Sequence, residues 1–219
     1  MERVLARLIE SEMDRHDGPV RLGTGFEYLY VRDTEGSVTE VEGAGHAPAE
    51  HAAWLGHGAL ATSDIDRLRS AYLGLVGVET SHTTRVRHHP EFDRGTGLTD
   101  GDVTVTWVPL ANANVEIWQY HHPPTHGCAD LCFESPGCGH LAFECHPVEF
   151  TDVVHRAVEH GFDVADPPRT NDGVRLARLR DPDGNWAELL AFDELDDRRS
   201  LRQRPELGCM WTMNALLER

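Results

Sequence analysis

The stretch DPDGNWAELLAF at residues 181–192 decides the fold, because its plan occurs twice in the chain. It contains a tight turn and then a strand in which alternate residues point to opposite faces, with Glu188 near its middle. The stretch RDTEGSVTEVEG at residues 32–43 has the same turn, strand and acidic residue. Glu40 and Glu188 are therefore interpreted as equivalent positions of a repeated unit, and the repeat sets the architecture.

Two complete copies of this unit are predicted, at residues 54–120 and 137–192. Each copy begins with a short apolar strand that carries a histidine, WLGHGALAT in the first and GHLAFEC in the second. Apolar residues then recur at helical spacing over about 65–75 and 147–160, and glycines follow these segments. Three alternating segments complete each copy, which predicts the order βαβββ.

The N-terminus contains part of a third unit. An apolar stripe predicts a helix near Val4 to Ile9, and GFEYLYVRDTEGSVTEVEG then repeats the closing hairpin. This unit lacks the opening strand with its histidine, and we expect Glu40 to face solvent.

The repeat predicts four segments along the chain. They are a partial module with helix, strands and linker at 1–50, complete modules at 51–125 and 126–193, and a tail at 194–219. The stretch GCMWTMN in the tail is a candidate for the strand that the partial module lacks, from the same chain or from a partner.

The composition excludes several classes of function. The formal net charge is −17, which disfavours nucleic acid or an anionic membrane as a partner. The chain contains no lysine, so Schiff-base catalysis and a P-loop are excluded. Because no apolar run is long enough to span a membrane and the N-terminus does not resemble a secretory signal, we expect a cytoplasmic protein.

The five cysteines leave two interpretations open. Their odd number and the expected location argue against a disulfide framework. Three of them, with two histidines, fall in HGCADLCFESPGCGH, which raises the question of a zinc site; these are His126, Cys128, Cys132, Cys138 and His140. The spacing matches no common zinc module, so an ordinary loop is favoured, with Cys145 as a small buried residue on a strand.

A histidine in the opening strand and a glutamate in the closing strand recur in both complete modules. The pairs are His57 with Glu116 and His140 with Glu188. Taken singly, such a histidine is usually structural or exposed, and such a glutamate usually faces water. The matched recurrence instead favours one site in which two imidazoles and two carboxylates bind a divalent metal ion such as Ni, Zn, Mn, Fe or Co.

Strand alternation indicates what surrounds these ligands. The faces that carry Glu116 and Glu188 also carry aromatic residues, and the opposite faces are aliphatic. We therefore expect the aliphatic faces to pack on helices and the others to line a substrate cavity, whose predicted aromatic residues are Trp107, Trp118, Tyr120 and Trp186.

Four stretches resemble the vicinal oxygen chelate superfamily, which includes glyoxalase I, methylmalonyl-CoA epimerase, extradiol dioxygenases, and bleomycin- and fosfomycin-resistance proteins. They are HGALATSDIDRLRSAYLGLVGVE, VEIWQYHHP, PGCGHLAFEC and RLRDPDGNWAELLAF, within residues 54–192. The resemblance implies an α+β fold in which paired βαβββ modules form a curved, mixed-sheet cup around one metal ion. The partial N-terminal module is an addition to that plan.

The ligand pattern implies a class of reaction within this superfamily. His, Glu, His, Glu is similar to the pattern of glyoxalase I, and VEIWQYHHP looks nearer to the epimerase-like branch. The resemblance thus implies a metal-dependent isomerase, epimerase or lyase acting on a small molecule, with Glu188 or Glu116 as the base. The alternatives are an Fe(II)-dependent extradiol-type dioxygenase and a non-catalytic drug-binding or resistance protein. A homodimer is also expected.

Overall fold

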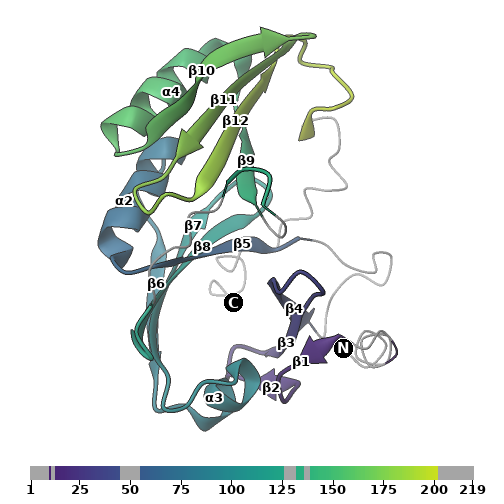
Figure 1. The fold of residues 1–219 in the computed structure, drawn as a ribbon, viewed down its shortest axis with the longest axis vertical. Coiled ribbons are helices and arrows are strands. Elements are labelled where there is room, and N and C mark those ends of the chain that lie inside the picture. The colour runs from purple at the N-terminus through teal and green to yellow at the C-terminus, as the bar shows by residue number, and fades with distance from the viewer. Residues whose placement is uncertain (1–9, 11–12, 45–54, 126–131, 136–138, 202–219) are drawn as a thin grey trace.

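The computed structural model describes the whole chain except residues 1–9, 11–12, 45–54, 126–131, 136–138 and 202–219. The predicted α+β fold is confirmed: three four-stranded sheets are accompanied by a few short helices. Two of the sheets belong to the paired βαβββ modules, and the third belongs to the partial N-terminal module (Figure 1). Among the described residues, no helix is long and apolar enough to cross a membrane.

The first module contains six elements. They are β5 (His57–Thr62), α2 (Ile65–Val76), β6 (His82–Arg87), α3 (Pro90–Thr96), β7 (Asp102–Pro109) and β8 (Asn114–His122). The strand order is β5-β8-β7-β6, so the first and last strands of the module are neighbours. They pair parallel to each other, whereas the other pairs are antiparallel.

The second module repeats this topology. Its elements are β9 (His140–Glu144), the 3-10 helix η1 (Pro147–Glu149), α4 (Phe150–Glu159), β10 (Asp163–Asn171), β11 (Val174–Arg180) and β12 (Trp186–Phe192). The order β9-β12-β11-β10 matches the first module strand for strand, including the parallel pairing of β9 with β12. The predicted order of strand, helix and three strands is therefore found in both copies, and the first copy has the helix α3 in addition.

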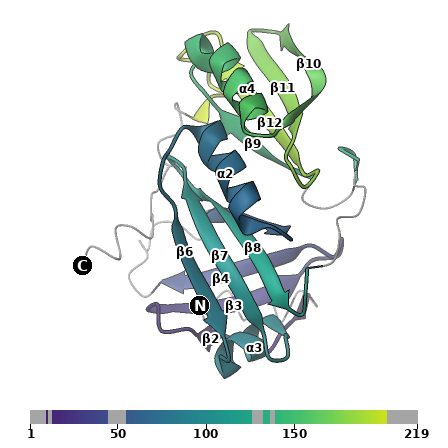
Figure 2. The ribbon, with the colours of Figure 1, turned by 90° about the vertical axis from the view of Figure 1, so that its left-hand side faces the viewer.

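The helices α2 and α4 pack together, and their buried faces form part of the main hydrophobic core (Figure 2). Helix α2 begins after Asp64, whose side chain accepts a hydrogen bond from the backbone N–H of Arg67, and ends at Gly77 in the left-handed conformation. The aliphatic faces of β8 and β12 pack against this pair of helices, as predicted. At the end of α2, Arg156 of α4 donates to the carbonyl oxygens of Gly74 and Leu75, at 2.8 and 3.2 Å.

Helix α3 was not predicted. It begins after His89, whose ring accepts a hydrogen bond from the backbone N–H of Phe92, has Pro90 in its first turn and ends at Gly97. These start and stop signals are present in the sequence, but the helix is too short to show a periodic apolar stripe. Its buried Phe92 contributes to a second, smaller apolar cluster with residues of β7 and β8.

The N-terminal sheet contains the predicted hairpin, β3 (Phe26–Arg32) and β4 (Val38–Ala44). Two short strands, β1 (Asp14–Arg15) and β2 (Val20–Arg21), pair with β3 and were not predicted. The sheet lies across from the curved sheet of the first module, on the side away from α2 (Figure 1). The helix predicted near residues 4–9 and the tail stretch GCMWTMN lie outside the described residues.

Candidate metal site

The register of the parallel strands brings His57 and Glu116 together. Glu116 on β8 pairs with Ala59 on β5, which is two residues from His57 and on the same face of the sheet. The Nε2 atom of His57 lies 3.4 Å from Oε2 of Glu116. The first of the two predicted pairs of ligands is therefore formed.

Two tryptophans hold the Glu116 carboxylate. The residue is buried, with 4% of its surface exposed. The indole N–H of Trp118 donates to Oε2 at 2.7 Å, and Trp107 also hydrogen-bonds the carboxylate. The register pairs Trp107 directly with Glu116, so both tryptophans are on the glutamate's face of the sheet. These donors limit the conformations of a carboxylate that would otherwise be buried without partners.

Glu40 joins this pair from the N-terminal sheet. One ligand atom from each of Glu40, His57 and Glu116 can be chosen so that all three lie within 4.8 Å of one another. Tyr30, the cross-strand partner of Glu40, hydrogen-bonds its carboxylate. The expectation that Glu40 faces solvent was wrong, because the hairpin lies against the first module and its acidic face is turned toward His57.

Burial and crowding change the pKa values of this cluster. Burial, and then the charge of Glu116, raises the pKa of Glu40 to about 7. Burial also raises the pKa of Glu116. For His57 burial acts downward, but the carboxylates of Glu116, Glu40 and Glu42 raise the pKa above its ordinary value. Burial and crowding thus disfavour ionisation of the carboxyl groups in this cluster.

The donor chemistry fits a divalent cation. No lysine exists in the chain, and in the described part no arginine forms an ion pair with Glu40 or Glu116. Apart from His57, the two carboxylates therefore have no cationic partner among the described residues, and a metal ion would supply one. One imidazole and two carboxylates are ligands that Zn, Mn, Fe, Co and Ni accept.

The second predicted pair is also formed, in its own sheet. Glu188 pairs with Ala142, two residues from His140, which repeats the geometry of the first module. The Nε2 atom of His140 lies 3.9 Å from Oε2 of Glu188. Here, however, Arg178 places its Nε atom 3.5 Å from Oε1 of Glu188.

The structure does not gather the four predicted ligands into one cluster. Among the described residues, Glu40, His57 and Glu116 form the one group of three or more such side chains with all ligand atoms within 4.8 Å, and His140 and Glu188 are outside it. The binding of one ion by His57, Glu116, His140 and Glu188 stays a prediction.

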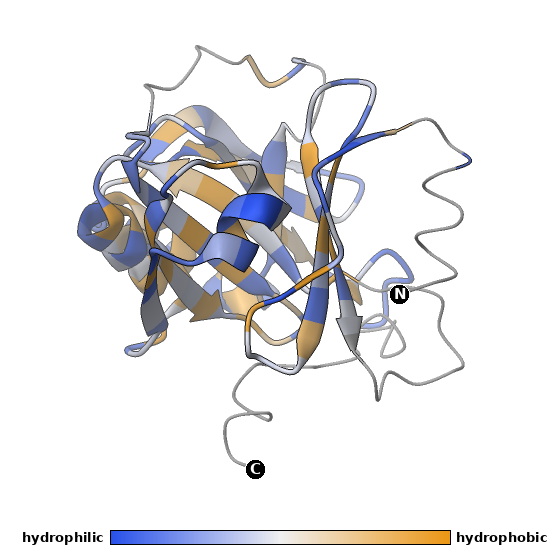
Figure 3. Cartoon of the chain, turned by 90° about the horizontal axis from the view of Figure 1, so that it is seen from below, coloured by the Kyte–Doolittle hydropathy of each residue, from blue (hydrophilic) through white to orange (hydrophobic). Residues whose placement is uncertain are grey.

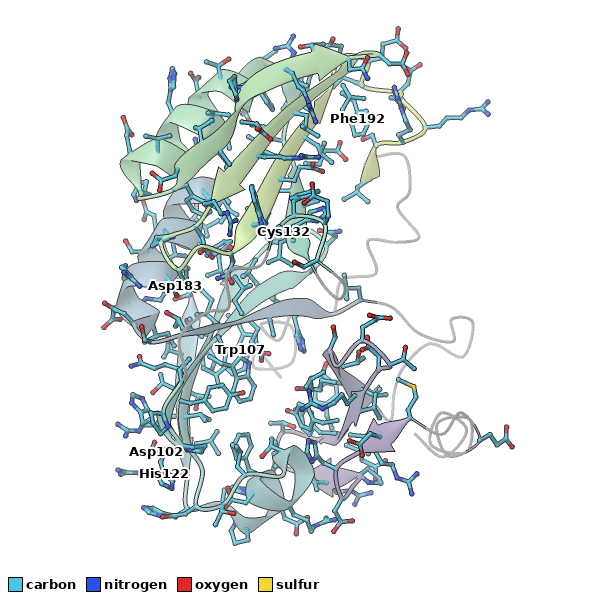
Figure 4. The ribbon with its side chains drawn as sticks, in the orientation of Figure 1. Asp102, Trp107, His122, Cys132, Asp183 and Phe192 are labelled. Carbon is cyan, nitrogen blue, oxygen red and sulfur yellow. The ribbon has the colours of Figure 1, made fainter. Side chains whose placement is uncertain are left out.

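Of the four predicted aromatic residues, three lie in the first module with the His57–Glu116 pair, and one lies in the second module with the His140–Glu188 pair. Trp107, Trp118 and Tyr120 pack in the smaller apolar cluster beside Glu116, with rings of Trp118 and Tyr120 stacked at 5.9 Å. Trp107 points from the first-module sheet toward the N-terminal hairpin (Figure 4). Hydrophobic residues alternate with polar ones along the strands of the sheets (Figure 3). Trp186 lies in the second module, where Arg180 stacks over its ring at 3.7 Å.

Three residues of functional interest were not found from the sequence. Tyr30 faces Glu40 across the hairpin, and Arg178 faces Glu188 across β11 and β12. The turn in each hairpin fixes which residues face each other, so both contacts could have been predicted from the cross-strand pairing. Phe133 stacks on His140 at 4.5 Å from a loop that carries no such signal.

The described cysteines behave as loop and packing residues. Cys132 is exposed and forms a hydrogen bond with Ser135 at 3.2 Å. Cys145 follows β9 directly and packs against the main core. The other members of the predicted zinc alternative, His126, Cys128 and Cys138, lie outside the described residues.

Solved structures share this fold. A glyoxalase family protein from Bacillus cereus aligns with a TM-score of 0.56 and 17% identity, over 67% of this chain and 99% of its own length. Glyoxalase I from Zea mays aligns with a TM-score of 0.58 and 13% identity, over 86% of this chain and 63% of its own length. Identities this low show the fold alone.

A comparison with protein-family models identifies the family, which the structural comparisons do not. The family model described as Glyoxalase/Bleomycin resistance protein/Dioxygenase superfamily matches residues 54–189, which is more than half of the chain. Among curated proteins, none matches the sequence.

Proposed function

We propose that this chain, which belongs to the Glyoxalase/Bleomycin resistance protein/Dioxygenase superfamily, is a metal-dependent isomerase, epimerase or lyase. Its reaction would move a proton at a carbon next to a carbonyl group of a small molecule. The observation that supports this most is the approach of His57 to Glu116, a carboxylate that is buried beside aromatic rings and has no arginine partner in the described structure.

His57 and Glu116 are the core of the proposed site. They belong both to the four residues predicted from the sequence and to the cluster seen in the structure. A divalent metal ion held there would supply a Lewis acid, which lowers the pKa of a C–H bond adjacent to a carbonyl and stabilises the negative charge that develops.

Glu116 is the proposed base. Its carboxylate can take the proton from the carbon and return it, either to the neighbouring carbon or to the other face of the same carbon. The first outcome is an isomerisation and the second is an epimerisation. Trp107 and Trp118 would keep the carboxylate oriented during both steps. The same role predicted for Glu188 in the second module stays a prediction.

The aromatic residues favour a small, partly apolar substrate. Trp118 stacks between Phe92 and Tyr120, with ring centroids at 6.0 and 5.9 Å, so the surface beside Glu116 is largely made of rings. Such a surface excludes water, which strengthens the electrostatic contribution of the charged groups.

Hydrogen–deuterium exchange at carbon tests this function without knowledge of the product. The metal-loaded protein is incubated in D₂O with α-hydroxy ketones, thiohemiacetals of 2-oxoaldehydes and 2-substituted thioesters, and NMR follows loss of the C–H signal. We expect exchange with at least one class and a loss of at least about 100-fold in Glu116→Gln.

Two other outcomes would count against the proposal. Oxygen consumption by the Fe(II)-loaded protein with a phenolic compound, without carbon exchange, would indicate a dioxygenase. Tight binding of an aromatic compound by metal-free protein, with no turnover of any class, would indicate a binding or resistance protein. Glu42→Gln is the control, because Glu42 adds charge near His57 but is not a member of the three-residue cluster.

A further inference from the structure

We propose that Glu40, from the partial N-terminal module, is the third protein ligand of the metal ion, and that His140 and Glu188 are not ligands. The inference rests on the proposed function only in taking a divalent ion to bind at His57 and Glu116. It changes the site from one shared by two complete modules to one shared by the first module and the N-terminal hairpin.

The hairpin holds Glu40 in a defined position. Strand β4 pairs with β3 along its whole length, and this register sets Glu40 opposite Tyr30. The phenol of Tyr30 hydrogen-bonds the carboxylate, which restricts its rotamers in the way that supporting residues orient metal ligands. Glu40 thus approaches His57 and Glu116 from a different sheet.

The three side chains form a donor set that a bound cation would stabilise. One carboxylate oxygen of Glu40 and one of Glu116 lie within 4.8 Å of each other and of a ring nitrogen of His57. Within the described structure, their ion-pairing partner is His57 alone, which contacts Glu116. A divalent ion bound between Glu40 and Glu116 would offset the repulsion between the two carboxylates.

In the second module, the negative charge of Glu188 already has a cationic partner. Arg178 is the cross-strand partner of Glu188 and lies 3.5 Å from it, and Arg178 also lies 3.6 Å from Asp166 on the other neighbouring strand. The ring of Phe133 holds this guanidinium at 4.0 Å and stacks on His140. A metal ion at Glu188 would meet the positive charge of Arg178, so this pair is a poor site for a second cation.

Three protein ligands are also the number expected of a catalytic site. Catalytic zinc sites keep three protein ligands and leave a position open for water or substrate. With Glu40, His57 and Glu116 the set is complete within residues 14–122, and the substrate oxygens would occupy the open positions.

Metal binding separates the two ligand sets directly. The full-length protein is freed of metal with a chelator and titrated with Zn²⁺ by calorimetry and with Co²⁺ by visible absorption. We expect wild type to bind one ion per chain, Glu40→Gln to weaken binding by at least about tenfold, and Glu188→Gln to bind within about twofold of wild type. Tyr30→Phe, which removes the supporting hydrogen bond, is expected to weaken binding by a smaller factor.

The controls distinguish a lost ligand from lost charge or lost fold. Glu42→Gln removes one negative charge from the same face of β4 and should leave the affinity within about threefold of wild type. Circular dichroism checks that each variant is folded, and Tyr30→Phe provides a second test if Glu40→Gln is unstable.

The outcomes also separate this inference from the proposed function. Wild-type affinity in Glu40→Gln together with lost binding in Glu188→Gln would overturn the inference and leave the proposed function standing, because the ion would then use the second-module pair. A comparable loss in both variants would overturn it as well. If His57→Ala retains the ion with wild-type affinity, the proposed function fails whatever Glu40 does.

Discussion

Trp118 and His57 both contact one carboxylate oxygen of Glu116. The indole N–H of Trp118 donates to Oε2 of Glu116 at 2.7 Å, and Nε2 of His57 lies 3.4 Å from that oxygen. Trp118 is two residues from Glu116 on β8, so the strand itself places donor and acceptor on one face. Part of the orientation of Glu116 is therefore set within β8, and Trp107 of β7 and His57 of β5 add to it.

Replacement of Trp118 by Phe removes this hydrogen bond but keeps an aromatic ring. We expect metal affinity to fall about tenfold, since supporting donors of metal ligands contribute on this scale. The free energy of unfolding of the metal-free protein should fall by about 1 to 3 kcal/mol, because a buried carboxylate loses a donor. Calorimetry and urea denaturation measure the two effects. Trp186→Phe, in the other sheet, is the matched control and should leave the metal affinity unchanged.

Replacement of Gly95 by Ala tests how the N-terminal sheet is held against the first module. A Cβ atom at Gly95 would lie 2.6 Å from a methyl carbon of Val20 on β2, which is 1% exposed. Alanine normally stabilises a helix by about 1 kcal/mol relative to glycine, but here overpacking should cost about 1 to 3 kcal/mol. Hydrogen exchange should therefore quicken in β2 and β3. Unchanged exchange in these strands would contradict the close packing, and Val20→Ala should relieve the effect.

Replacement of Gly74 by Ala tests the contact between the two complete modules. A Cβ atom there would lie 2.1 Å from Cγ of His160, at the end of α4. We expect a lower melting temperature for Gly74→Ala in the wild-type background. In a His160→Ala background the obstacle is gone, and the same change should stabilise the protein by up to about 1 kcal/mol through helix propensity. If Gly74→Ala changes the stability in the same direction in both backgrounds, the helices do not meet at this point.

The four tyrosines should resist ionisation in the folded protein. Burial is the largest cause in each case: it raises the pKa of Tyr28 to about 12 and also raises those of Tyr30, Tyr72 and Tyr120. Because the folded pKa values are above the ordinary value of about 10, these groups favour the folded state below pH 10, and this contribution is lost as the pH rises further.

Absorbance at 295 nm measures this behaviour. We expect little tyrosinate at pH 10 in the folded protein and a cooperative appearance of all four at higher pH, together with loss of the far-ultraviolet circular dichroism signal. Urea-unfolded protein should titrate near pH 10. Early ionisation of some tyrosines in the folded protein would show that the N-terminal hairpin does not cover the first module, since Tyr28 and Tyr30 belong to that hairpin.

Local patterns in the sequence predicted most of the fold. Alternation along β8 and β12 assigned their faces correctly, because the aliphatic faces pack on the helices. Strands β1 and β2 have two residues each, too few for any alternation to appear. The repeat then placed His57 beside Glu116 and His140 beside Glu188, because equivalent residues in equivalent strands have equivalent registers.

The position of Glu40 could not be predicted in the same way. Acidic residues that alternate along a strand usually face water, and Glu40 obeys that pattern within its own hairpin. Its burial depends on where the hairpin lies relative to another sheet, which is a contact between distant parts of the chain. The role of Arg178 beside Glu188 was within reach, since the turn after β11 fixes which residues face each other across the hairpin.

The parallel pairing of first and last strands makes each His–Glu pair a product of the finished module. His57 is on β5 and Glu116 is on β8, and every other element of the module lies between them in the chain. No fragment that ends before β8 can bring the two side chains together, so during synthesis the pair arises only after the ribosome has delivered the final strand. Closing so long a loop is slow compared with forming a local hairpin. Assembly of this pair therefore reports that the module has folded from end to end.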